Sequence, residues 1–174
     1  MTQNLFTNNV TIITGASSGI GEQLALQLAA QGAWLALAAR DEARLETVAA
    51  ECRARGGKSI AIKTDVTDQA QCAAMVARTA QEFGRVDTLV NNAGVGMWAR
   101  FDEIVDPAFY ARIMQVNYLG SVFCTFYALP HLKKSRGRIV AVSSLTGKTG
   151  VPTRSGYAAS KHAMVGFFDH FASN

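Results

Sequence analysis

Short apolar runs alternate along the chain with longer segments whose apolar residues recur every three or four positions. The short runs predict buried strands, and they span residues 10–14, 33–39, 59–63, 86–90 and 138–143. The longer segments predict helices over residues 22–31, 41–55, 67–83 and 107–134, and from the region of Tyr157 to the end of the chain. This alternation predicts an α/β fold, with a doubly wound parallel sheet between two helical layers and a ligand site at the carboxyl ends of the strands.

Length and composition fit one globular domain over residues 1–174. The chain is 49% hydrophobic and 17% charged, which is typical of a folded protein. Its first ten residues lack the pattern of a signal peptide, and no apolar run is long enough to span a bilayer. We therefore expect a cytoplasmic protein without a membrane partner. The net charge of +4 comes from scattered residues, so we expect no nucleic-acid partner.

The three cysteines are Cys52, Cys72 and Cys124, which lie far apart in segments predicted to be helical. Their odd number and spacing indicate neither a disulfide framework nor a metal site. We interpret them as small, buried apolar residues, and we expect no metal ion.

A glycine-rich turn joins the first predicted strand to the first predicted helix, with the spacing Thr14-Gly15-x-x-x-Gly19-x-Gly21. Gly15 permits a tight turn, Gly19 lets the backbone approach a pyrophosphate, and Gly21 brings the helix close to the strand. The helix amino terminus then offers free N–H groups to phosphates. In this strand-turn-helix setting, the glycines predict a dinucleotide site.

The residue that follows the second strand distinguishes NADP from NAD. An acid at that place binds the ribose 2'-hydroxyl of NAD, whereas an arginine accommodates the 2'-phosphate of NADP. Arg40 follows Ala39 here, which favours NADP, although a strand that extends one residue further would bring Asp41 to the ribose. Asp65 follows the third strand, where it either accepts a hydrogen bond from the adenine amino group or caps a turn.

Residues 143–161 carry the groups that suit proton transfer. Tyr157 and Lys161 are four residues apart, so they share one face of a helix. An ammonium next to a tyrosine favours the phenolate, and a nearby hydroxyl from Ser143 or Ser144 can hold the oxygen of a carbonyl or alcohol. These groups predict interconversion of a ketone and an alcohol.

With these motifs assembled, the chain resembles the classical short-chain dehydrogenase/reductase family. The matching motifs are TGASSGIG at residues 14–21, the Asp65-Val66 pair, NNAG at residues 91–94, Asn117, the serine after the fifth strand, and YAASK at residues 157–161. The family places its serine thirteen residues before the tyrosine, which selects Ser144.

The resemblance implies a Rossmann fold and a role for each matched residue. Tyr157 is the acid/base, Lys161 favours its phenolate and holds the nicotinamide ribose, Ser144 positions the substrate oxygen, and Asn117 supports a water in the proton relay. The implied cofactor is NADP in preference to NAD. The implied contacts to it are Gly15, Ser17, Ser18, Gly19, Ile20, Gly21, Arg40, Asp65, Val66, Asn92, Ala93, Gly94, Tyr157 and Lys161.

Family members are longer than this chain. The resemblance therefore implies a fold truncated after its sixth main helix, without the later strands and the segment that covers the substrate. The expected function is that of an NADP-dependent oxidoreductase acting on a small carbonyl or alcohol substrate. The alternative is a catalytically incomplete fragment that acts only as a dinucleotide-binding or interaction module.

Aromatic residues outside the motifs have two interpretations. Met97, Trp98 and Phe101 either line a substrate pocket or pack on the core. By resemblance, the helix after Pro107 and the helix with Tyr157 form the contact of a homodimer or homotetramer. Their aromatic residues belong either to that contact or to the core, and they are Phe123, Phe126, Tyr127, Phe167 and Phe168.

Overall fold

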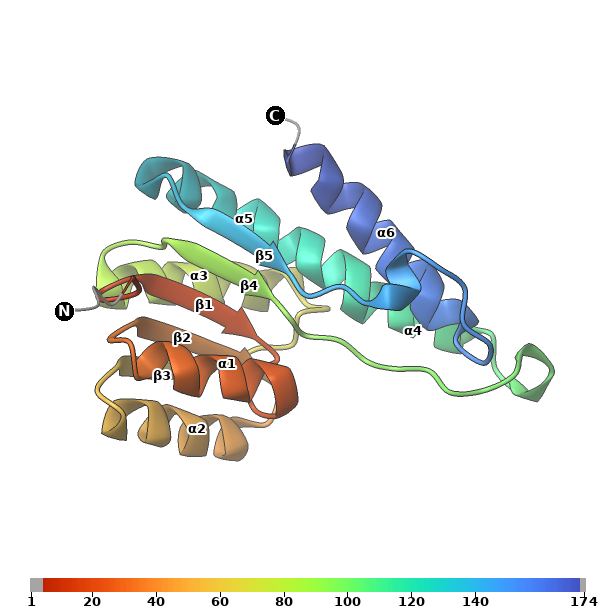
Figure 1. The fold of residues 1–174 in the computed structure, drawn as a ribbon, viewed down its shortest axis with the longest axis horizontal. Coiled ribbons are helices and arrows are strands. Elements are labelled where there is room, and N and C mark those ends of the chain that lie inside the picture. The colour runs from red at the N-terminus through yellow and green to blue at the C-terminus, as the bar shows by residue number, and fades with distance from the viewer. Residues whose placement is uncertain (1–4, 173–174) are drawn as a thin grey trace.

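In residues 5–172, which the computed structural model describes, five parallel strands form one sheet with helices on both faces (Figure 1). The strands are β1 (Val10–Thr14), β2 (Trp34–Ala39), β3 (Lys58–Lys63), β4 (Thr88–Asn91) and β5 (Arg138–Ala141). The helices are α1 (Gly19–Ala29), α2 (Glu42–Ala54), α3 (Gln69–Phe83), α4 (Ala108–Met114), α5 (Gly120–Ser135) and α6 (Ser155–Ala172). The predicted α/β/α architecture is confirmed. The last two residues of the expected final helix, 173–174, lie outside the described part.

The strand order is β3-β2-β1-β4-β5, and all neighbouring pairs are parallel. The chain runs outward from β1 to β3 and then crosses back to β4 on the other side of β1. Such a reversal opens a crevice at the carboxyl ends of the two central strands. The predicted ligand site lies at this edge.

Each face of the sheet has its own apolar core. Ile13 and Leu37 point to the face covered by α1 and α2, whereas Ile12 and Leu89 point to the face covered by α3 and α5. Since β1 is buried at all five positions, its side chains contribute to both cores. This two-sided burial explains why the strands are continuous apolar runs rather than alternating ones.

The helix predicted over residues 107–134 is present from Ala108 to Ser135, but its middle is not α-helical. A π-helical segment, Gln115–Leu119, separates α4 from α5. Its wider turn places Asn117 inside the protein, where the residue has no exposed surface. Short π-helical turns occur often at functional sites.

All three cysteines are buried, as predicted. Burial raises the pKa of the Cys52 thiol to about 11, so this thiol is protonated and unreactive at neutral pH. Cys72 of α3 and Cys124 of α5 are far apart in the sequence, but their Sγ atoms lie 3.6 Å apart where the two helices cross. The thiols thus fill the contact between these helices as small apolar groups.

Two kinds of feature are missing from residues 5–172. No helix there combines the length and apolar character needed to cross a membrane. In the same residues, no group of three or more His, Cys, Asp or Glu side chains could hold a metal ion.

Candidate active site

The glycine-rich turn after β1 has the geometry that its spacing predicts. Gly15 has a φ of +67°, and a Cβ there would lie 2.9 Å from the Ala93 Cα. A Cβ on Gly21 would overlap the Gly15 carbonyl oxygen, so this glycine sets how closely α1 approaches the turn. Gly19 has a φ of +60° and nothing within 4 Å of its Cβ position, so the space before it is open to a ligand.

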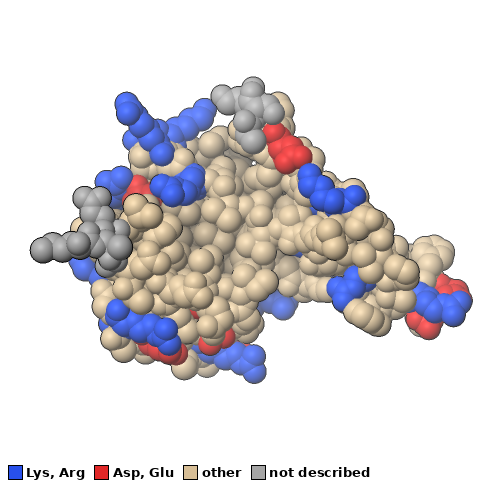
Figure 2. Space-filling view, viewed as in Figure 1, with Lys and Arg blue, Asp and Glu red and all other residues tan. Residues whose placement is uncertain are grey.

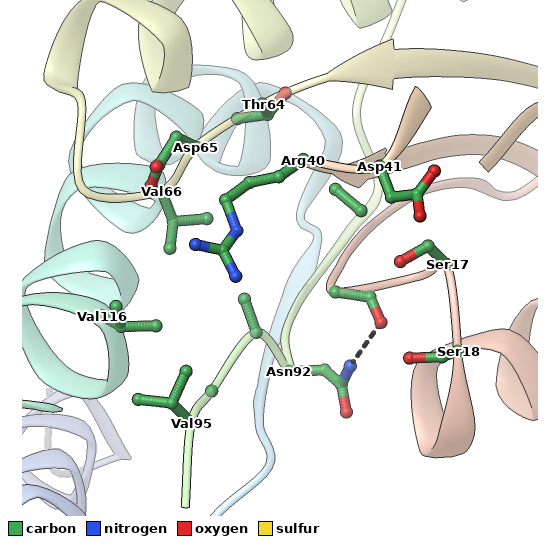
Figure 3. Close-up of a pocket in the computed structure, with 14 residues that line it drawn as sticks. Ser17, Ser18, Arg40, Asp41, Thr64, Asp65, Val66, Asn92, Val95 and Val116 are labelled. Carbon is green, nitrogen blue, oxygen red and sulfur yellow. Dashed lines mark hydrogen bonds between the residues drawn. The ribbon is translucent and has the colours of Figure 1, made fainter. Parts of the chain in front are cut away.

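Two side chains hold this turn in place, that of Thr14 at the end of β1 and that of Asn92 directly after β4. The Thr14 Oγ1 accepts hydrogen bonds from the backbone N–H groups of Asn92 and Ala93, both at 3.0 Å. The Asn92 Nδ2 donates to the carbonyls of Thr14 at 2.9 Å and Gly15 at 3.2 Å. Figure 3 shows the Asn92 amide against the turn. Asn92 and Ala93 of the NNAG motif therefore support the loop that begins the predicted dinucleotide site.

A cavity of about 330 Å³ lies at the carboxyl ends of β1, β2, β3 and β4 (Figure 3). Most of the predicted cofactor contacts line it. They are Gly15, Ser17, Ser18, Arg40, Asp65, Val66, Asn92, Ala93 and Gly94. The other predicted contacts do not border this cavity. They are Gly19, Ile20, Gly21, Tyr157 and Lys161.

Sequence reasoning missed several residues of the cavity wall. They are Ala39, Thr64, Val95 and Val116. Three of them directly adjoin predicted residues in the chain, so extending each motif by one position would have found them. Val116 belongs to the π-helical segment, and nothing in the sequence indicated that this segment reaches the cavity.

Arg40 and Asp41 point in different directions. The strand β2 ends at Ala39, as predicted, and the Arg40 guanidinium projects into the cavity toward Val66 and Asn92 (Figure 3). The Asp41 carboxylate caps α2 instead, because its Oδ1 accepts the backbone N–H of Arg44 at 3.1 Å. The same carboxylate lies 3.5 Å from the Arg44 side chain. Both residues border the cavity, but the Asp41 carboxylate is engaged by its own helix, whereas the Arg40 guanidinium projects into the cavity.

Asp65 is partly engaged by its own loop. Its Oδ1 accepts hydrogen bonds from the Thr67 backbone N–H at 3.0 Å and from the Thr67 hydroxyl at 2.8 Å. Its backbone N–H donates to the Gln71 side chain at 2.8 Å. Asp65 caps a turn, as one of its two interpretations proposed, and it also borders the cavity.

Ser144 lies three residues after β5, at the start of a short 3-10 helix, Leu145–Gly147. Its Oγ accepts hydrogen bonds from the Thr146 N–H at 3.3 Å and the Thr146 hydroxyl at 3.0 Å. The neighbouring Ser143 Oγ is buried without a partner among the described residues. Gly147 lets the 3-10 helix approach α6, because a Cβ there would lie 3.0 Å from the Lys161 carbonyl oxygen.

Tyr157 and Lys161 lie in the first two turns of α6, as predicted. Lys161 is 4% exposed, its Nζ donates to the Val142 carbonyl at 2.7 Å, and it lies 5.7 Å from the centre of the Tyr157 ring. Burial lowers the pKa of the Lys161 ammonium. The half-buried Tyr157 therefore has a buried cation next to its ring, on the helix that packs against the Ser144 segment.

The Asn117 side chain joins three parts of the site. Its Oδ1 accepts the Val95 N–H at 2.8 Å, and its Nδ2 donates to the Val95 carbonyl at 3.0 Å and to the Ser160 hydroxyl at 2.9 Å. Both functional atoms of the amide are thus engaged. The side chain connects the loop after β4 to α6, and the backbone carbonyl of Asn117 accepts a hydrogen bond from the Ser121 hydroxyl at 3.0 Å.

The segment after NNAG contains three side chains that were predicted either to line a substrate pocket or to pack on the core. Met97 is 3% exposed and packs inside the protein, where its Sδ lies 3.2 Å from the Gly156 nitrogen. Trp98 and Phe101 are 77% and 78% exposed. The core interpretation holds for Met97, and the other two side chains lie at the surface.

Comparison with known proteins agrees with this geometry. The family model described as short chain dehydrogenase matches residues 9–174. Among curated proteins, the 11-beta-hydroxysteroid dehydrogenase-like 4A of Arabidopsis thaliana is 46% identical over 161 residues, which are 92% of this chain and 54% of that protein. The 11-beta-hydroxysteroid dehydrogenase of Pinus massoniana is 44% identical, with 92% and 45% covered. The chain therefore spans about half the length of these relatives.

Solved structures show the same fold. An alcohol dehydrogenase from the archaeon Thermococcus sibiricus, complexed with 5-hydroxy-NADP, is 32% identical with a TM-score of 0.90, covering 94% of this chain and 69% of that one. A putative short-chain alcohol dehydrogenase from Sinorhizobium meliloti is 32% identical with a TM-score of 0.92, covering 98% and 68%.

Proposed function

The chain belongs to the short-chain dehydrogenase family, and on that premise we propose an NADP-dependent oxidoreductase that interconverts a ketone or aldehyde and the corresponding alcohol, with Tyr157 as acid/base. The observation that carries the proposal is the pairing of Tyr157 with the buried Lys161 on α6, packed against the Ser144 segment. A cation at this place would offset negative charge that develops on the Tyr157 oxygen during proton transfer. The substrate is a small molecule with one carbonyl or hydroxyl group at this place.

The cavity residues fit a dinucleotide. The open space before Gly19 and the amino terminus of α1 suit the pyrophosphate, with Ser17 and Ser18 beside it. Arg40 would bind the ribose 2'-phosphate, and the Oδ2 of Asp65 would accept from the adenine amino group. The structure of a relative with 5-hydroxy-NADP supports NADP as the cofactor.

The residues of α6 and the Ser144 loop would manage one proton. When bound, the nicotinamide supplies or accepts the hydride. In the reducing direction, the Tyr157 hydroxyl gives its proton to the substrate oxygen, which the Ser144 Oγ holds by a hydrogen bond. Lys161 would offset the negative charge left on the Tyr157 oxygen, and Asn117 would support a water that returns the proton, with its backbone carbonyl shared between that water and the Ser121 hydroxyl.

One observation favours the alternative, a dinucleotide-binding or interaction module without turnover. Neither Ser144 nor Tyr157 borders the cavity, so this space fits the phosphate and adenine portions of a dinucleotide without involving the proton-transfer groups. The two functions predict different effects on carbonyl reduction when the Tyr157 hydroxyl is removed. A module would bind the nucleotide equally well with phenylalanine at this position and would reduce no carbonyl compound in either form.

Titration with NADPH and NADH tests the cofactor assignment. We expect tighter binding of NADPH, and Arg40→Leu should weaken it by about tenfold to a hundredfold, the effect of losing a hydrogen-bonded charge pair. NADH binding should change little. Binding is followed by nucleotide fluorescence, and thermal stability is measured on the same samples.

The matched control is Arg78→Leu, because Arg78 is an exposed arginine on α3 that does not border the cavity. This variant should bind both nucleotides like the parent protein. Tighter binding of NADH by the parent would contradict the assignment and would point to Asp41 as the residue that contacts the ribose.

A further inference from the structure

Arg154 lies between two aromatic rings near the proposed proton-transfer groups. Its Cζ is 4.4 Å from the centre of the Trp98 ring and 5.9 Å from the centre of the Tyr157 ring. Arg154 is half-buried, whereas Trp98 is 77% exposed. The guanidinium therefore lies beneath a surface indole and beside the tyrosine that carries the proposed chemistry.

Backbone contacts fix the position of this arginine. The Ala99 N–H donates to the Thr153 carbonyl at 3.0 Å, which joins the Trp98 segment to the loop before α6. Thr153 has a φ of +65°, a left-handed conformation that is uncommon for a β-branched residue. Such a conformation persists only when its surroundings hold it, and it occurs preferentially at ligand sites and active sites. The loop thus presents Arg154 in a defined place.

The guanidinium has no acidic partner. Throughout the described residues, no Asp or Glu side chain forms an ion pair with Arg154, and its guanidinium donates no hydrogen bond. By contrast, Arg100 in the neighbouring loop pairs with Asp102 at 2.9 Å. Ring contacts engage a guanidinium through its flat face and leave the N–H donors at its edge. Among the described residues, no carboxylate therefore pairs with the Arg154 donors, and the nearby Lys161 adds a second positive charge beside Tyr157.

We propose that Arg154 determines specificity by binding a carboxylate of the substrate whose carbonyl or hydroxyl lies at Tyr157. This inference rests on the proposed function and names its substrate class as oxo acids and the corresponding hydroxy acids. Since Arg154 and Tyr157 are neighbours, only a short carbon chain separates the carboxylate from the carbonyl. A guanidinium recognises a carboxylate through two parallel hydrogen bonds, which also fixes the orientation of the substrate. The proposal adds a binding contact and no chemical step.

Fluorescence of Trp98 provides a test that does not require turnover. The chain has two tryptophans, so a Trp34→Phe background leaves Trp98 as the reporter beside Arg154. The probes are 4-oxopentanoate and its methyl ester, which differ in charge. We expect the acid to bind at least tenfold more tightly than the ester, and Arg154→Met should remove this preference while leaving ester binding unchanged. Arg154→Lys should retain part of it.

The matched control is Arg138→Met, because Arg138 begins β5 at the opposite end of the sheet and is exposed. It should bind acid and ester like the parent. Equal binding of the two probes by the parent, or an equal loss of both in Arg154→Met and Arg154→Lys, would overturn the inference.

Reduction of the same two probes by the intact protein with NADPH separates this inference from the proposed function. Selective reduction of the acid that disappears in Arg154→Met supports both. Reduction of acid and ester at equal rates, unchanged in Arg154→Met, supports the oxidoreductase and overturns the role of Arg154. Binding of the acid through Arg154 without reduction of either probe supports the anion site and contradicts the oxidoreductase.

Discussion

The Tyr157 ring has one cation from its own helix and one from the preceding loop. Lys161 and Arg154 lie 5.7 and 5.9 Å from its centre. Tyr157→Phe keeps the ring and these contacts but removes the hydroxyl. We predict that turnover falls by about 10²- to 10⁴-fold, the usual effect of a general acid/base, while NADPH affinity stays within about threefold. Steady-state rates and nucleotide titration measure the two quantities.

Tyr127→Phe is a suitable control for that variant. Tyr127 of α5 packs edge-on against Phe126 and lies outside the site, so loss of its hydroxyl should leave turnover unchanged. Unchanged turnover in Tyr157→Phe would contradict the acid/base role.

The Lys161 ammonium is nearly fully buried, and this makes the stability of the protein depend on pH. Because burial lowers its pKa below the ordinary value of 10.5, the unfolded chain binds the proton more tightly than the folded chain. Well below the folded pKa both states are protonated, and the full burial penalty is present. Between the folded pKa and 10.5 the unfolded state carries more of the proton, so the free energy of unfolding rises with pH by at most about 1.4 kcal/mol per pH unit.

We therefore predict that the parent protein gains stability relative to Lys161→Met as the pH increases from 7 toward 10. Urea unfolding of both proteins at each pH measures the difference. The high pKa of the Cys52 thiol acts in the opposite direction, but it is common to both proteins and cancels. A difference that stays constant over this range would show that burial does not shift the titration of Lys161.

The positions of single residues were predictable from the sequence where neighbouring residues decide them. The end of β2 at Ala39 placed Arg40 at the cavity because strand and turn are specified by neighbouring residues. Asn117 could be named from its motif, but not the saturation of its amide by Val95 and Ser160. Arg154 was missed altogether, since its position depends on Trp98, which is remote in sequence. The local pattern of apolar and polar residues does not show which distant segments come into contact in the fold.

Among the elements, the strands were the most predictable because they are continuous apolar runs bounded by polar or glycine residues. The range of β1 agrees with its prediction, whereas β4 begins two residues later than predicted and ends at Asn91. The interruption between α4 and α5 was not predictable, because the residues of a π-helical segment have the same apolar spacing as an α-helix to within one residue. Gly120, the first residue after this segment, lies against Val66 of a distant loop, where a Cβ would be 2.7 Å from the valine Cγ2.

The contact between α1 and the turn after β1 depends on Gly21. A Cβ at this position would overlap the Gly15 carbonyl oxygen and lie 2.6 Å from the Asn92 Nδ2. Because both neighbours belong to the hydrogen-bonded turn, neither can move away without breaking it. We predict that Gly21→Ala lowers the free energy of unfolding by about 1–3 kcal/mol, the usual range for overpacking, and weakens nucleotide binding. Urea denaturation and NADPH titration measure these effects.

Gly166→Ala is the matched control, because Gly166 lies within α6 with nothing within 4 Å of its Cβ position. The same substitution there should raise stability by about 0.5–1 kcal/mol through helix propensity alone. If the two variants had the same effect, the close approach at Gly21 would not be what determines the position of α1.

On the scale of the whole molecule, the two edges of the sheet differ. The edge strand β3 has a lysine at each end, Lys58 and Lys63, and charges of this kind discourage pairing with another chain. At the opposite edge, β5 pairs with β4 on one side, and in residues 5–172 no strand pairs with its other side. A largely apolar groove follows this edge. It is lined by Leu129, Leu132, Ile139, Ala141, Phe168 and Phe171, together with Lys133, Arg136 and Gly137. Figure 2 shows a broad uncharged surface in the middle of this view, with Lys and Arg mostly at its margins.

An exposed strand edge beside an apolar groove favours association between chains, because unpaired backbone groups and apolar side chains are presented together. We predict that the 174-residue chain associates with itself as its concentration increases, and that Val140→Lys weakens this association. Val140 is 41% exposed on β5, so a lysine there places a charge at the edge without altering the core. Sedimentation velocity over a range of concentrations measures the effect. Val105→Lys, at a 98% exposed position outside the sheet, should behave like the parent. A parent chain that sediments as a monomer at every concentration would show that the charges around this edge are sufficient to keep the chains apart.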